Sequence, residues 1–293
     1  MSRNHDFVVK CNKSLVSDTP DALLKSNNTL MSLHTKAQAK SSEVAGNAIF
    51  KLTCDQIDAG GVLLLMHSAI RTINLGWKVQ VGGTGGALDH LLKHINHYLT
   101  PPESRSEETD ELNYWLRNIS SKTQMVSELE NWARQVQEGS GASDEDVAQW
   151  QFQISEVTAN GFQHGRSEQP MLVAGKVDSE SGSVQLAALD FGETIPFTIM
   201  SHPNCPSGSN CDGKKVGFAC KQGMTAQTER ANQGRGLFNL VKAVKENGGT
   251  MRILSRNGLF HVLNGRGYSR NLSPFSQTCP VLDGTLVTVN LKI

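Results

Sequence analysis

The stretch ISEVTANGFQHG, residues 154–165, places Glu156, Asn160 and His164 four residues apart. Because four residues make about one helical turn, a carboxylate, a carboxamide and an imidazole lie in line on one stripe of a helix. A polar stripe of this kind is either a solvated face or a site. Apolar residues in and around the segment predict that the helix also packs on a core. These residues are Phe152, Ile154, Val157 and Phe162.

The composition is that of a globular chain with room for two domains. The chain has 293 residues, of which 38% are hydrophobic, and 28 basic residues balance 28 acidic ones. Nucleic acid is not indicated as a partner, because proteins that bind its phosphate backbone usually carry a basic excess. The six cysteines are too few and too scattered for a disulfide scaffold.

Neither a membrane span nor a secretion signal is predicted. The longest apolar stretch, GGVLLLMHSAI (60–70), falls short of the roughly 18–20 residues that a membrane helix needs. The N-terminal MSRNHDFVVKCNKS lacks the apolar centre of a secretion signal. We therefore expect a cytoplasmic protein without membrane attachment.

The first half of the chain predicts a flexible segment followed by a small α/β module. Residues 1–45 are polar and rich in Ser, Asn and Lys, with little periodicity. Residues 46–100 then alternate between strand and helix patterns. The predicted elements are a strand at 49–54, a helix at 58–75, a strand at 78–82 and a helix at 87–99.

Residues 101–142 predict a linker and a helical connector. The linker is Pro-rich and acidic, and the connector is expected to be helical over 112–137, with Trp115 and Leu116 buried. The final part, 143–293, begins with the long helix that carries the polar stripe, capped by Ser143 or Asp144. After it come strands at 170–177 and 183–191, a lid-like segment at 200–233, a helix at 236–249, a hairpin at 250–265 and a strand at 284–293.

Three further features follow the polar stripe in a fixed order. Asp190-Phe191-Gly192 ends a predicted strand, Gly234-Arg235-Gly236-Leu237 opens a helix, and Gly284-Thr285 opens the last strand. Glycines at a helix start expose backbone N–H groups that suit a phosphate. On the stripe, the Asn160 carboxamide oxygen can be a magnesium ligand, and Glu156 can accept a proton.

Together these four features resemble the GHKL ATPase family, whose members include gyrase-type topoisomerases, sensor histidine kinases and anti-sigma-factor kinases. The anti-sigma kinase branch is the most similar, because ISEVTANGFQHG has its pattern of Glu, Asn and His-Gly. The resemblance covers 143–293 and implies a GHKL (Bergerat) α/β sandwich in which helices cover one face of a mixed sheet. No phosphoacceptor helix of the histidine-kinase type precedes residue 143.

The resemblance implies a site for ATP and Mg²⁺. Glu156 would be the catalytic base and Asn160 the magnesium ligand, while His164 would either orient the site or be a packed histidine. Asp190 would accept a hydrogen bond from the adenine amine. Thr194 replaces the second glycine that the family has after Asp190 and Gly192. The other implied nucleotide contacts are Gly192, Ile195, Gly234, Arg235, Gly236, Leu237 and Thr285.

The implied activity is phosphoryl transfer to a protein Ser or Thr, or slow ATP hydrolysis. The alternative is a nucleotide-sensing interaction module with little turnover, although a pure sensor does not need the base that Glu156 supplies. Residues 46–100 loosely resemble a STAS-like domain, a family that includes anti-sigma-factor antagonists. The expected partner is a protein, either a STAS-like antagonist or a regulated effector, and GHKL domains often work as homodimers.

The lid-like segment carries four residues of types that bind zinc, namely His202, Cys205, Cys211 and Cys220. Their spacing lacks the paired Cys-x2-Cys of strong zinc motifs. Reduced, metal-free cysteines are the favoured interpretation, and a zinc-stapled lid is the alternative.

Overall fold

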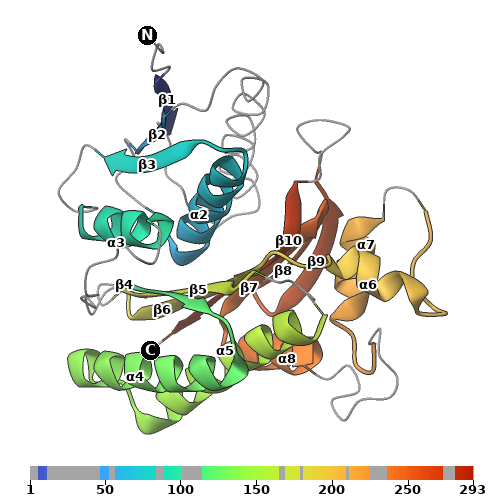
Figure 1. The fold of residues 1–293 in the computed structure, drawn as a ribbon. Helices are drawn as coiled ribbons and strands as arrows, with labels where there is room; N and C mark the ends of the chain where they lie inside the picture. Colours follow the sequence, from blue (N-terminus) through green and yellow to red (C-terminus); the bar gives the residue numbers. More distant parts are fainter. Residues whose placement is uncertain are drawn as a thin grey trace. The chain divides into compact units, whose positions relative to one another are not determined.

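The chain divides into two compact units, Met1–Asp110 and Glu111–Ile293, each described by itself below (Figure 1). The computed structural model describes residues 6–11, 47–52, 57–83, 89–100, 114–164, 169–178, 181–208, 211–224, 236–272 and 281–292. Within these ranges no helix has both the length and the apolar character needed to cross a membrane.

The first unit has a three-stranded parallel sheet in the order β1-β2-β3. The Asp58 carboxylate begins α2 by accepting a hydrogen bond from the Gly61 N–H at 2.7 Å, and Gly76 follows its end with a positive φ of 88°. The strand–helix–strand–helix order predicted for residues 46–100 is confirmed. The elements are β1 (Asp6–Cys11), β2 (Asn47–Leu52), α2 (Ala59–Asn74), β3 (Lys78–Gly83) and α3 (Asp89–Leu99).

One part of the segment 1–45, expected to be flexible, is a strand. β1 has the sequence DFVVKC, and its Phe and Val residues favour an extended chain. It pairs in parallel with β2 over its whole length, a partner distant in sequence. The remainder of the segment lies outside the described residues.

The second unit is built on a seven-stranded sheet in the order β4-β5-β6-β10-β7-β8-β9. Its first elements are β4 (Tyr114–Ile119), α4 (Lys122–Ser140), α5 (Asp144–His164), β5 (Met171–Asp178) and β6 (Ser183–Asp190). Next come α6 (Ile195–Thr198), η3 (Ile199–Ser201), α7 (Asp212–Ala219) and α8 (Gly236–Glu246). The last strands are β7 (Thr250–Arg256), β8 (Gly258–Leu263), β9 (Arg266–Asn271) and β10 (Leu282–Lys292).

The sheet of the second unit is antiparallel at every described pairing, so the expectation of a mixed sheet is wrong. Strands β6 and β7 do run in the same direction. However, the C-terminal strand β10 lies between them and pairs antiparallel with both. The parallel pair that would make the sheet mixed is therefore never formed between neighbours.

Two secondary-structure expectations also need correction. The connector expected to be helical over 112–137 begins as β4, and its helix α4 starts only at Lys122. β4 pairs antiparallel with β5, which lies more than fifty residues later in the sequence. This tertiary pairing overrides the apolar pattern that suggested a helix. Within the segment expected to be a lid, residues 212–219 form α7. Trp115 and Leu116 are buried, as predicted.

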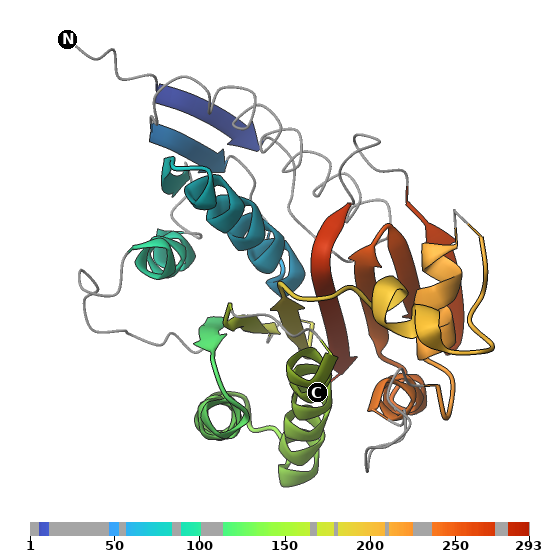
Figure 2. The same cartoon turned by 45° about the vertical axis from the view of Figure 1, so that its right-hand side comes forward.

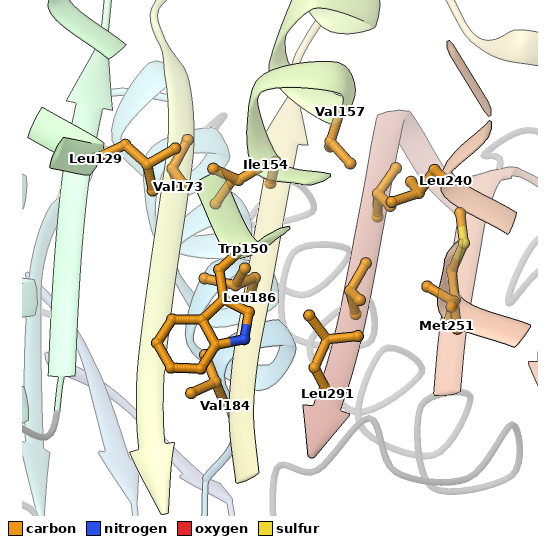
Figure 3. Packing of buried hydrophobic residues seen from close by; sticks show 14 of the residues in the cluster. Leu129, Trp150, Ile154, Val157, Val173, Val184, Leu186, Leu240, Met251 and Leu291 are labelled. Atoms are coloured by element: carbon orange, nitrogen blue, oxygen red, sulfur yellow. The ribbon is translucent and has the colours of Figure 1, made fainter. Parts of the chain in front are cut away.

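The helices α4, α5 and α8 lie together on one face of this sheet, as Figures 1 and 2 show. Figure 3 shows the core between them, where Trp150 and Ile154 of α5 meet Val173, Val184 and Leu186 of the strands. Burying each such side chain contributes about 1.5–3 kcal/mol. This packing holds α5 against the sheet and so fixes where its polar stripe lies.

Candidate functional site

The polar stripe belongs to α5, which begins as predicted. The Ser143 hydroxyl accepts a hydrogen bond from the Asp146 N–H at 3.2 Å, and three carboxylates of the first turn complement the helix dipole. Trp150, Ile154 and Val157 are buried, whereas Phe152 is 47% exposed, contrary to its expected packing. Its position in the helical repeat points it away from the sheet.

Glu156 and Asn160 lie half-buried on α5, where they meet the first residue of α8. A methyl group on Gly236 would lie 2.9 Å from Glu156 Oε2 and 2.9 Å from Asn160 Nδ2. A methyl group here would push on the ends of these two side chains, so the glycine lets them lie directly against the start of α8. The Asn160 Nδ2 is buried without a hydrogen-bond partner among the described residues. Glu156 and Asn160 therefore face the start of α8 and are only partly exposed to solvent.

Gly161 brings α5 next to the end of β6. A side chain at this position would collide with Met171 of β5 and would lie 3.6 Å from Asp190 Cβ. Asp190 is the last residue of β6, so the two halves of the predicted site are neighbours. Sequence reasoning missed Gly161, although its place inside ISEVTANGFQHG, next to Asn160, is a signal of close backbone approach.

Asp190 is a half-buried carboxylate held by three hydrogen bonds. Its Oδ1 accepts from the Gly192 N–H at 3.0 Å, and the backbone and hydroxyl of Thr285 also donate to it. Burial nevertheless dominates and raises the pKa of Asp190 from its ordinary 3.8 to about 7. Such a carboxylate gains from any further donor that a ligand brings.

Gly284 and Thr285 lie directly beside Asp190 on β10. Gly284 has a φ of 119° and leaves no room for a side chain against the Asp190 carbonyl. Thr285 is the cross-strand partner of Asp190 on one side and of Ser255 on the other. The three residues form a row across β6, β10 and β7, and Ser255 is a member that sequence reasoning did not find.

The departure at Thr194 has a structural account. Thr194 precedes α6 with φ −76° and ψ 149°, and its carbonyl accepts the N–H groups of Phe197 and Thr198. This is an ordinary extended conformation for a residue that starts a helix, so a glycine is not needed here. Ile195, which follows it, packs at the edge of the core with Leu237 of α8.

Cys205 and Cys211 both contact the Pro206 carbonyl, but the four residues of the zinc alternative do not form one cluster. His202 packs edge-on against Phe218, with ring centroids 5.2 Å apart, and Cys211 lies 2.9 Å from the Gly208 carbonyl. Cys220 is buried, which raises the pKa of its thiol. Over the part of the chain that the structure describes, no group of three or more metal-binding side chains is gathered.

Three of the predicted positions are not described in full. Gly234 and Arg235 lie outside the described residues, and His164 is described only as the last residue of α5, not in its side chain. The chain matches no protein-family model and no curated protein.

Proposed function

We propose that this protein is a regulatory protein of the GHKL type that binds Mg-ATP. The observation that carries the proposal is the convergence of the predicted motifs. Gly236 seats the start of α8 on Glu156 and Asn160, and Gly161 seats the same helix beside Asp190. Residues from α5, β6, α8 and β10 thus lie near one end of the central strands β6 and β10, although they are far apart in the sequence.

The side chains near this end of β6 and β10 suit an adenine nucleotide. Asp190 offers a carboxylate that can accept the exocyclic amine of adenine, and Gly192 lets the backbone pass close to a flat ring. The first N–H groups of α8 have no partner within the helix and favour phosphate oxygens. Asn160 would hold a magnesium ion through its carboxamide oxygen. Bound Mg²⁺ would neutralise charge on the phosphates.

Glu156 gives the site a base for catalysis. It precedes Asn160 by four residues on α5 and touches the same glycine of α8, so it faces the position proposed for the phosphates. There it would take the proton of an attacking hydroxyl, from water or from a Ser or Thr of a protein partner. The first unit, with its STAS-like order of elements, supports a role in a cytoplasmic protein-regulated switch.

The proposal is tested by measuring ATP binding and turnover on the same samples. We expect the wild type to bind Mg-ATP and to release or transfer the γ-phosphate slowly. Glu156→Gln should retain binding within about threefold and lose turnover by about a hundredfold or more. Binding without any turnover in the wild type, even with candidate protein substrates, would favour the sensing module instead. Absence of nucleotide binding would refute the proposal.

A further inference from the structure

Ser255 carries a hydroxyl that is fully buried yet makes several polar contacts. Its side chain is 0% exposed, and it lies on β7 opposite Thr285 of β10. The Ser255 Oγ is 2.9 Å from the Ile195 backbone nitrogen, 3.0 Å from Thr285 Oγ1 and 3.2 Å from the Gly284 carbonyl oxygen. A buried hydroxyl with three partners at the end of a strand is a specific arrangement, since most buried side chains here are apolar.

The hydrogen bonds at the two ends of this network have defined donors. The Ile195 N–H can only donate, so Ser255 Oγ accepts from it. Above its pKa of about 7, Asp190 is a carboxylate that can only accept, and the Thr285 hydroxyl donates to it. The single hydrogen of the Ser255 hydroxyl then has two acceptors within reach, Thr285 Oγ1 at 3.0 Å and the Gly284 carbonyl oxygen at 3.2 Å. A connected hydrogen-bond network therefore links the Ile195 N–H, Ser255, Thr285 and Asp190.

We propose that Ser255 is a positioning residue that ties the adenine-reading carboxylate to the start of the segment after β6. The inference rests on the proposed function, because it takes Asp190 to be the residue that binds the adenine ring. Ile195 is the first residue of α6, which leads into η3 and α7. Through Ser255, the orientation of Thr285 beside Asp190 and the position of α6 are set together. Adenine selectivity and the placement of this segment therefore depend on one hydroxyl.

This role makes an expectation that differs from simple support of the fold. A damaged site would lose affinity for every nucleoside triphosphate. A disoriented Asp190 instead loses only the contribution of the adenine amine. Inosine triphosphate has a carbonyl oxygen in place of the exocyclic amine, so it lacks the hydrogen bond that this amine donates to Asp190. Its affinity should therefore depend less on how Ser255 and Thr285 orient Asp190.

The test compares ATP and inosine triphosphate binding, with Mg²⁺, for the wild type, Ser255→Ala and Thr288→Val. Thr288 is the matched control, because it is a buried hydroxyl on β10 whose oxygen has no partner among the described residues. In Ser255→Ala we expect ATP to bind about five- to tenfold more weakly, with the affinity for inosine triphosphate unchanged within twofold. Thr288→Val should keep the wild-type ratio.

A second measurement, made without any nucleotide, follows the hydrogen bond between Ser255 and the Ile195 N–H. Hydrogen exchange of a peptide covering α6 should be faster in Ser255→Ala than in wild type, because the Ile195 N–H loses its acceptor. Circular dichroism melting confirms that each variant is folded. Ser255→Cys, which keeps a weaker hydrogen-bonding group on a somewhat larger atom, should fall between Ser255→Ala and wild type.

The outcomes separate this inference from the proposed function. If the wild type binds neither nucleotide, the proposed function fails and the role of Ser255 falls with it. If the wild type prefers ATP and Ser255→Ala keeps that preference, the positioning role of Ser255 is wrong while the proposed function stands. Equal losses of affinity for both nucleotides would show that Ser255 only supports the fold and would also overturn its positioning role.

Discussion

Replacing Asp190 by asparagine should remove the loss of stability with rising pH that this carboxyl causes in the nucleotide-free protein. Burial raises the pKa of this carboxyl to about 7 from its ordinary 3.8. Asparagine has nearly the same shape and keeps an oxygen for the Gly192 N–H, but it carries no charge to desolvate. The substitution therefore removes the unfavourable charge and leaves the Gly192 hydrogen bond in place. It also replaces one acceptor oxygen by an NH2 group, which weakens the contacts with Thr285 at every pH, so the prediction concerns the change of stability with pH.

The sign and size of the effect follow from the two pKa values. Below pH 3.8 the carboxyl is protonated in the folded and unfolded chains alike, and the wild type has its full stability. As the pH rises through about 7, the wild type loses stability, because the unfolded chain ionises more readily. The full difference corresponds to roughly 4 kcal/mol at about 1.4 kcal/mol for each pH unit. Asp190 is only half-buried, and solvent reduces the expected gain between pH 5 and pH 8 to about 1–2 kcal/mol.

The assay is urea unfolding of wild type and Asp190→Asn at several values between pH 5 and pH 8. Hydrogen exchange of peptides from β6 and β10 reports the unit that contains Asp190, which matters because a chain of two units need not unfold in one step. We expect the free energy of unfolding of Asp190→Asn to rise relative to wild type as the pH increases. A difference that stays flat across this range would refute the assignment of a buried, proton-retaining carboxyl.

Three other variants and labels give independent checks. Gly284→Ala should lower the free energy of unfolding by more than about 3 kcal/mol in urea denaturation, because φ is 119° and backbone atoms crowd the site. The control Gly182→Ala, at φ 57° in open space, should cost about 1 kcal/mol. Equal losses in the two variants would contradict this. Gly236→Ala should change stability by less than about 1 kcal/mol, since a methyl group meets only the ends of flexible side chains, yet weaken Mg-ATP binding about tenfold in calorimetry; unchanged binding would remove α8 from the site. Cys220 is buried and its thiol pKa is raised, so mass spectrometry should find it unmodified by a maleimide until the protein unfolds, and rapid native labelling would disprove its burial.

The helices were the part of the fold that the sequence predicted best. The helices α2, α3, α5 and α8 have local signals, namely periodic apolar residues and recognisable start or stop residues. β4 was mistaken for helix because a short apolar run such as YWLRNI fits both periods. β9, RGYSRN, is largely exposed and shows no alternation, so only its pairing with β8 defines it.

The candidate site divides in the same way. The Glu156–Asn160 stripe and the strand-end Asp190 follow from residue types at fixed spacing. The row that joins Asp190, Thr285 and Ser255 depends on the register of three strands, and Ser255 is sixty-five residues from Asp190 along the chain. Gly161 likewise acquires its role only when α5 packs on the sheet. Pairings of this kind are tertiary, so no local pattern reports them.

The most direct test of the nucleotide site is a calorimetric titration of the full chain with Mg-ATP, run in parallel on Asp190→Asn and on the control Thr288→Val. The account predicts that the wild type and Thr288→Val bind ATP alike and that Asp190→Asn binds it at least tenfold more weakly, because the adenine amine then meets an amide in place of a carboxylate. ATP binding of equal strength by all three proteins, or by none of them, would contradict it.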